Sequence, residues 1–150
     1  MIEKANATSI PADVIPHKPI SALGALNEAP DYGSSFSRGM RFELPGYSML
    51  LISGTASVDE KGDTVHVGDF EAQCWRTFRN ITALLESEGA TWHHIARTTC
   101  YIKDIQRDYD AFNKVRTAFY EEQGLAPVPA STGIEARLCR DDLLVEIEAI

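Results

Sequence analysis

The sequence predicts an α+β domain in which two helices pack on one face of a single mixed β-sheet. Two segments, 70–88 and 109–123, repeat apolar residues at three- and four-residue spacing, and the segments around them alternate or are rich in β-branched residues. The chain has 150 residues, of which 44% are hydrophobic, and this suits one domain with a buried core. The predicted element order is β-β-β-α-β-α-β-β.

Residues 1–34 are predicted to form an extended arm, and residues 35–150 the folded domain. The arm lacks periodicity and holds four of the seven prolines, Pro11, Pro16, Pro19 and Pro30. It contains no apolar run long enough for a secretion signal or a membrane span. We expect it to lie over the domain surface or over a neighbouring subunit.

The folded part is predicted to begin with a β-hairpin. Residues 40–44 alternate between apolar and charged side chains, and Pro45-Gly46 supplies a turn before residues 47–52. A second turn at 59–63 leads to a short strand predicted at 64–67.

Capping residues set the ends of the predicted helices. Asp69 is the expected N-cap of the first helix and Gly89 suits its C′ position, while Gly124 ends the second helix. The remaining strands are predicted at 95–102, 130–138 and 143–150. The last of these carries apolar side chains on both faces, so something other than the two helices must cover the second face of the sheet.

Composition narrows the function. A net charge of −8 and an isoelectric point near 4.9 argue against nucleic acid as the main partner, because phosphate binding needs clustered Lys and Arg. The three cysteines show no CxxC spacing, which favours a reducing, cytoplasmic location and argues against zinc. The sequence contains no Gly-rich phosphate loop, dinucleotide fingerprint or metal-ligand spacing, so no metal or other cofactor is expected.

Four motifs, occurring in one order along the chain, resemble the Rid/YjgF family. They are Leu-Ile-Ser-Gly-Thr-Ala-Ser at 51–57, Thr-Thr-Cys-Tyr-Ile-Lys-Asp at 98–104, Tyr-Asp-Ala-Phe-Asn at 109–113, and a closing hairpin formed by 129–136 and 143–150. The resemblance implies a homotrimer, with a central barrel built from three sheets and a small-molecule cleft at each subunit interface. The C-terminal half of chorismatases is a more distant resemblance.

The resemblance also implies a set of site residues. In the family, Pro-Ala-Arg-Ser precedes the last strand and its Arg holds a substrate carboxylate, but this chain has Ser131 at that position. Glu146 matches the glutamate that places the attacking water, and its apolar neighbours should raise its pKa as a general acid or base requires. The other residues that the resemblance places in the cleft are Phe36, Asn113, Thr132 and Gly133.

Several alternatives stay open at this point. Glu146 and Glu148 could simply form a solvated face, and Asn113 could be an exposed helical residue. Arg38 is the nearest substitute for the missing arginine, or else an ordinary exposed strand residue. The leading function is a Rid-like hydrolase or deaminase with weak activity on amino-acid-derived imines. The alternatives are a chorismatase-like enol-ether hydrolase and a ligand-binding or chaperone-like trimer without turnover.

Overall fold

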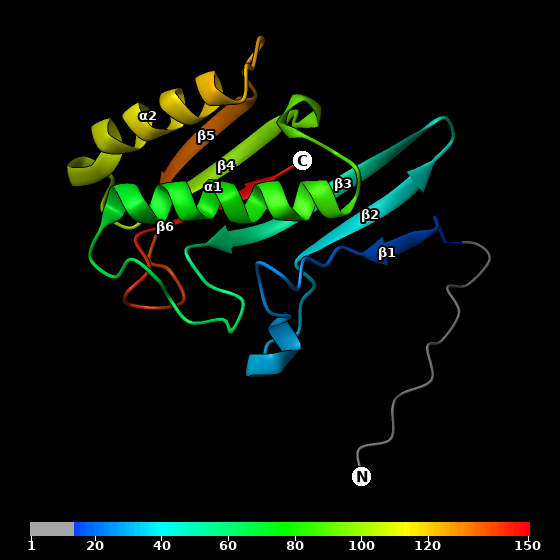
Figure 1. Cartoon of the computed structure of the whole chain (residues 1–150), viewed down its shortest axis with the longest axis horizontal. Helices are drawn as coiled ribbons and strands as arrows, with labels where there is room; N and C mark the ends of the chain where they lie inside the picture. Colours follow the sequence, from blue (N-terminus) through cyan, green and yellow to red (C-terminus); the bar gives the residue numbers. More distant parts are fainter. Residues whose placement is uncertain (1–13) are drawn as a thin grey trace.

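The computed structural model describes residues 14–150, which form a sheet with two long helices on one face (Figure 1). The sheet has six strands in the order β1-β2-β3-β6-β4-β5. The strands are β1 (His17–Pro19), β2 (Gly39–Leu44), β3 (Tyr47–Ala56), β4 (Arg97–Ile102), β5 (Ala130–Glu135) and β6 (Val145–Ala149). The helices are α1 (Phe70–Ser87) and α2 (Ile105–Glu122), with short 3-10 turns at Ala29–Tyr32 and Trp92–His94.

The predicted fold class, a single mixed sheet with both helices on one face, is confirmed. β4 and β5 are parallel, and every other neighbouring pair is antiparallel. The prediction of a closing hairpin was wrong, because β4 lies between β5 and β6 and pairs with both. Turn residues show that two strands follow each other closely in the chain. They do not show that the two strands pair, because an earlier strand can lie between them in the sheet.

The predicted element order is observed and the predicted hairpin at 40–44 and 47–52 is confirmed as β2 and β3, but the third of the first three strands is not the expected one. No strand forms at 64–67 in the described structure, where a single bridge joins Val58 to Thr64. The additional strand is β1, which pairs antiparallel with β2. Val65 and Val67 made the predicted segment apolar enough to resemble a strand, but its backbone folds back on the residues just after β3, where the N–H of Val65 donates to the carbonyl of Ser57 at 3.0 Å.

The described part of the expected arm, from residue 14 to residue 34, packs into the domain. β1 extends the sheet, and the side chains of Ile20 and Leu26 are completely buried in the main core. The prolines that suggested coil are compatible with β1, because Pro19 ends this edge strand. The predicted boundary at residue 35 therefore lies within packed structure, and residues 1–13 of the arm lie outside the described residues.

Both helices begin at a side-chain cap. Asp69 caps α1 as predicted, its carboxylate accepting from the backbone N–H of Ala72 at 3.0 Å. Asp104 caps α2 in the same way through the N–H of Arg107, so α2 begins four residues before its predicted start. The polar residues of the first turn, 106–108, concealed this start because they interrupt the apolar periodicity.

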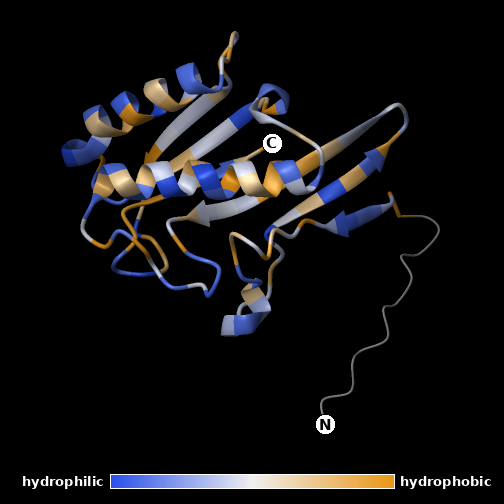
Figure 2. Ribbon diagram, in the orientation of Figure 1, coloured by the Kyte–Doolittle hydropathy of each residue, from blue (hydrophilic) through white to orange (hydrophobic). Residues whose placement is uncertain are grey.

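The main core lies between the two helices and the sheet. Polar and apolar residues alternate along both helices (Figure 2), as expected for helices with one face on a sheet. Aromatic side chains from α1, α2 and the 3-10 turn at Trp92–His94 pack against one another, with Phe78 stacked on Phe119 at 4.6 Å between ring centroids. This core holds the strands that carry the candidate site.

Candidate functional site

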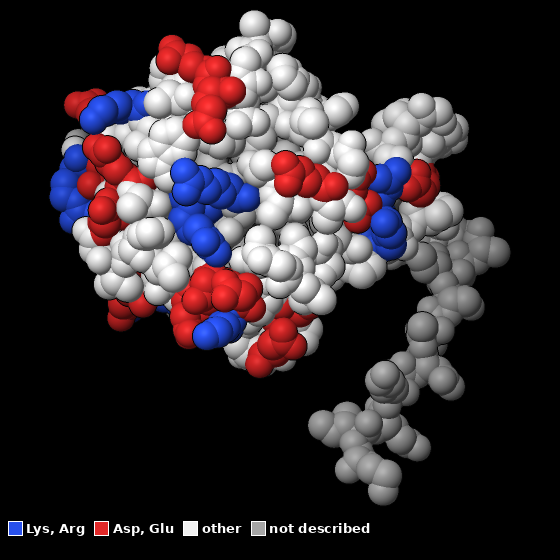
Figure 3. Space-filling model, viewed as in Figure 1, with Lys and Arg blue, Asp and Glu red and all other residues white. Residues whose placement is uncertain are grey.

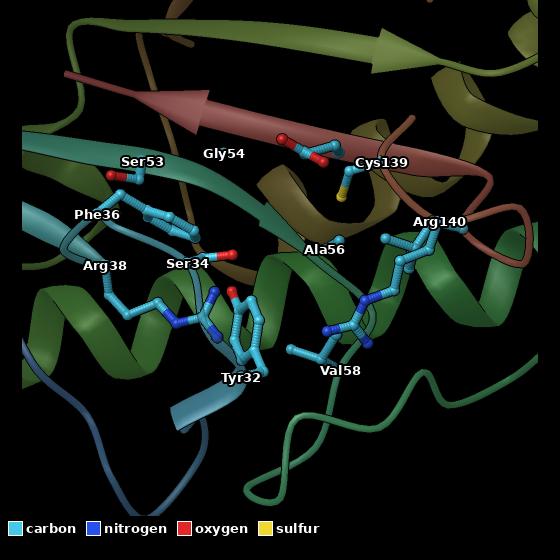
Figure 4. Close-up of a pocket in the computed structure, with 12 residues that line it drawn as sticks. Tyr32, Ser34, Phe36, Arg38, Ser53, Gly54, Ala56, Val58, Cys139 and Arg140 are labelled. Atoms are coloured by element: carbon cyan, nitrogen blue, oxygen red, sulfur yellow. The ribbon is translucent and has the colours of Figure 1, made fainter. Parts of the chain in front are cut away.

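A cavity of about 460 Å³ opens beside β6 (Figure 4). Its walls come from the 3-10 turn at Ala29–Tyr32, the segment leading into β2, the end of β3, the loop before β6, and β6 itself. The residues that matter chemically are Tyr32, Phe36, Arg38, Gly54, Arg140 and Glu146. Three sequence-predicted site residues, Phe36, Arg38 and Glu146, therefore line the same cavity.

Glu146 reaches this cavity because of the alternation of β6. Val145 and Ile147 are buried on the helix-covered face, so Glu146 points to the opposite face and is half-buried there. Burial raises the pKa of the Glu146 carboxyl group, and the nearby Glu148 adds to the increase, while the positive charge of Arg38 opposes it. A carboxyl group whose pKa is raised in this way is a stronger base than an ordinary glutamate and is suited to accept a proton from water.

A β-bulge makes room for the Glu146 carboxylate. The pairing of β3 with β6 shifts between Ile52 and Thr55, where three steps along β3 match two steps along β6. Gly54 lies in this bulge, and a Cβ atom there would overlap Glu146 Oε1 and come within 3.0 Å of its Cδ. The glycine thus permits the carboxylate to lie directly over the backbone of β3.

Arg38 is buried, with 5% of its surface exposed, so the alternative of an exposed strand arginine is wrong. Its Nε donates to the backbone carbonyl of Asn27 and its Nη2 to Asn27 Oδ1, both at 2.8 Å. The guanidinium carbon also lies 5.6 Å and 5.5 Å from the ring centroids of Tyr32 and Phe36. These contacts hold a positive charge at one wall of the cavity.

The cavity contains a second arginine, Arg140, which sequence analysis did not identify as a site residue. The sequence Arg-Asp-Asp at 140–142 resembles a solvated turn, but Arg140 Nη1 donates to the carbonyl of Gly62 at 2.6 Å. Its guanidinium carbon lies 5.4 Å from the ring centroid of Tyr32. The contact joins residues that are 78 positions apart, so no local pattern could have indicated it.

Asn113 and Ser131 lie together, but in a different place from Glu146. Arg116 of α2 connects them, since Nη2 donates to Asn113 Oδ1 at 2.5 Å and Nη1 to Ser131 Oγ at 3.1 Å. Ser131 pairs with Thr98 on the helix-covered face, whereas Glu146 pairs with Tyr101 on the other face. Within one chain the two groups are therefore on opposite faces of the sheet.

The other two predicted cleft residues are also apart. Gly133 faces the start of α2, where Tyr109 and Ile105 are its nearest neighbours. Thr132 points to the helix-free face and accepts a hydrogen bond from Arg97 at 2.9 Å. The expected wall of Ser131, Thr132 and Gly133 is thus divided between the two faces by the alternation of β5.

The family of this chain follows from comparison with known proteins. A family model described as Endoribonuclease L-PSP matches residues 27–150. The chain is 34% identical over 103 residues to a 2-iminobutanoate/2-iminopropanoate deaminase of Salmonella typhimurium, covering 69% of this chain and 78% of that relative. This chain belongs to the Rid/YjgF family.

Other members of the Rid/YjgF family agree with this assignment. A 3-aminoacrylate deaminase, RutC, of Acinetobacter baylyi is 28% identical over 103 residues, covering 69% of this chain and 78% of the relative. The crystal structure of the YjgF gene product of Escherichia coli matches with a TM-score of 0.72 at 26% identity, covering 88% of this chain and 95% of that chain. The Rid/YjgF fold is shared over nearly the whole described structure.

Two further properties of this Rid/YjgF chain bear on its partners. Within residues 14–150, no helix has the length and apolar character needed to cross a membrane, and no three His, Cys, Asp or Glu side chains are grouped to hold a metal ion. On the face shown in Figure 3, small groups of Lys and Arg lie between acidic side chains. This mixture of charges offers no broad basic surface on that face.

Proposed function

We propose that the protein is a Rid-like deaminase that adds water to the C=N bond of a small substrate, with Glu146 as the general base. The observation that carries the proposal is a half-buried carboxyl group with a raised pKa in a cavity that also contains Arg38 and Arg140. The family and the deaminase relatives support the reaction class.

The reaction follows from the chemistry of the cavity. Glu146 takes a proton from water while the oxygen forms a bond to the imine carbon, and the C=N electron pair moves to nitrogen, which receives that proton from Glu146. Glu146 then takes the hydroxyl proton of the carbinolamine and delivers it to the amine nitrogen, and ammonia leaves as the C–N bond breaks and the C=O bond of the product forms. Arg38 and Arg140 supply positive charge where negative charge develops on the substrate.

We further propose that the complete cleft lies between subunits of a homotrimer. Ser131 and Asn113 cannot meet Glu146 in one chain, because they lie on the other face of the sheet. All six residues of β5 are exposed, Ile134 among them at 41%, and β5 is an edge strand. If a second copy covers this edge, the Glu146 cavity of that second copy would lie against the Ser131 region of the first.

The substrate range depends on the group that replaces the family's arginine. Ser131 offers a hydroxyl group but no charge, so by itself it should bind a carboxylate weakly. With Ser131 alone, we expect only slow hydrolysis of 2-imino acids.

Hydrolysis of imines made in situ by an amino-acid oxidase tests the reaction. Semicarbazide traps the remaining imine, so the protein should reduce trapping, and Glu146→Gln should abolish this effect because an amide cannot accept the proton. In the wild type, kcat/KM should increase with pH through an apparent pKa above the ordinary value for glutamate. A Glu146→Gln variant as active as the wild type would refute the proposed base.

Turnover of enol ethers alone would favour the chorismatase-like function, and saturable ligand binding without any turnover would favour a binding protein.

A further inference from the structure

The guanidinium group of Arg116 occupies a defined position beside Ser131. It reaches back from α2 to Asn113, one turn earlier, and across to Ser131 on β5. The face of Phe112 supports it, with 5.0 Å from the guanidinium carbon to the ring centroid. Contacts with three different side chains hold this long side chain in one orientation, and both hydrogen-bond partners are neutral oxygens.

Arg116 lines a cavity of about 350 Å³ together with Tyr120 and Ser131, and apolar side chains, Leu125 and Val128 among them, form part of its wall. Ser131 Oγ lies 3.1 Å from Thr98 Oγ1 and 3.7 Å from Cys100 Sγ. Tyr120 is buried in the wall of this cavity.

The charge of Arg116 is available to a ligand. Among residues 14–150, no acidic side chain forms a salt bridge with it, including Glu121, which lines the same cavity. By contrast, Arg38 and Arg140 donate to backbone carbonyls and so hold the local chain in place. A half-buried guanidinium group that contacts only neutral oxygens favours a bound anion.

We propose that Arg116 is the anion-binding residue of this site and that it holds a ligand carboxylate beside Ser131. In the family, the positive charge lies on the strand before the last one. In this chain, Arg116 of α2 supplies it. The ligand class is a small carboxylic acid, and its role as a substrate rests on the proposed function. With Arg116 in place, 2-imino acids become substrates that Ser131 alone could not hold.

Binding measurements separate this inference from catalysis. The probe is 2-oxobutanoate, the acid that hydrolysis of 2-iminobutanoate would yield, compared by calorimetry with its uncharged methyl ester. Wild-type protein should bind the acid about tenfold to a hundredfold more tightly than the ester, as expected for a charge-assisted contact. Arg116→Gln should remove this preference and leave the affinity for the ester unchanged. Arg116→Lys should restore part of the preference, because it keeps the charge but not the planar fork.

Arg79→Gln is the matched control, since it removes the same charge from an exposed position on α1. It should bind both probes like the wild type, whereas an equal loss in both variants would show a general charge effect and overturn the inference.

The double variant Arg116→Gln with Ser131→Arg should recover the preference for the acid. An Arg116→Gln variant that keeps the preference would refute the inference, and so would a folded double variant that does not recover it. Arg116-dependent binding without imine turnover would refute the proposed reaction and leave the anion site standing.

Discussion

Glu146 obtains its chemical character from neighbours that are distant in the sequence. The cavity walls around it come from other segments, Gly54 of β3 makes room for the carboxylate, and Arg38 opposes the increase in its pKa. The alternative of a solvated face on β6 does not describe Glu146, which is half-buried in a cavity. A strand with strict alternation can therefore carry a functional carboxylate on its less buried face.

The raised pKa of Glu146 predicts a specific pH dependence of stability. Between the ordinary pKa of glutamate, about 4.3, and the raised value, the folded protein binds more protons than the unfolded chain, so the free energy of unfolding should fall as pH rises. Glu146→Gln lacks this titration and should become more stable than the wild type as pH increases through that range. Urea unfolding of both proteins at a series of pH values measures the difference, and parallel curves would contradict the prediction.

Gly54→Ala should impair catalysis without preventing folding. The added methyl group overlaps the Glu146 carboxylate and must displace it from the cavity. A misplaced general base should lower kcat by roughly tenfold to a hundredfold in the imine assay. Gly24→Ala is the control, because a Cβ there meets no atom within 4 Å and its backbone needs no positive φ. Full activity in Gly54→Ala would show that the carboxylate position is not important.

At the scale of elements, one buried side chain connects α1 to the loop before β6. Gln73 is completely buried, its Nε2 donates to the carbonyl of Asp142 at 2.8 Å, and its Oε1 accepts from the N–H of Leu144 at 2.9 Å. These bonds satisfy the backbone of a loop that passes under the helix. They also attach the residues just before β6 to α1.

Gln73→Met should therefore destabilise the protein although it preserves the size of the side chain. It leaves the partly buried N–H of Leu144 and the partly buried carbonyl of Asp142 without their Gln73 partner, at a cost of roughly 1–3 kcal/mol in the free energy of unfolding. Denaturant unfolding measures the loss. The exposed Gln106 of α2 provides the control, since Gln106→Met should change stability by less than about 0.5 kcal/mol. Equal stability of both variants would refute the role of the buried amide.

At the scale of the molecule, the candidate residues lie in two separate groups, which the proposed function treats as two half-sites of one cleft. Glu146, Arg38 and Phe36 lie beside the helix-free face, whereas Arg116 and Asn113 of α2 meet Ser131 of β5 on the helix-covered face, at the edge of the sheet. No side-chain rearrangement can bring them together in one chain, since the sheet lies between them. This arrangement supports the proposal that neighbouring subunits complete each other's clefts.

Mixed oligomers test this proposal directly. Glu146→Gln and Arg116→Gln should each be inactive or nearly so, but co-expression of the two should restore activity. If each cleft takes Glu146 from one subunit and Arg116 from the next, about one cleft in four in randomly mixed trimers contains both wild-type residues. An inactive mixture of folded trimers would show that Glu146 and Arg116 do not act in one shared cleft, and a monomer by light scattering would refute the trimer itself.

The sequence alone determined the helices, most strands, the N-cap of α1 and the family, because these depend on local periodicity, capping and short motifs. Asp69 caps α1 through a residue three positions away, and Glu146 was identified by its motif. Only the tertiary structure decided that β4 separates β5 from β6, that Arg38 is buried, and that Arg140 and Arg116 lie at the two half-sites. The reason is that a short motif specifies neither the order of strands in a sheet nor the partner of a long side chain. Both depend on contacts between segments that are far apart in the chain.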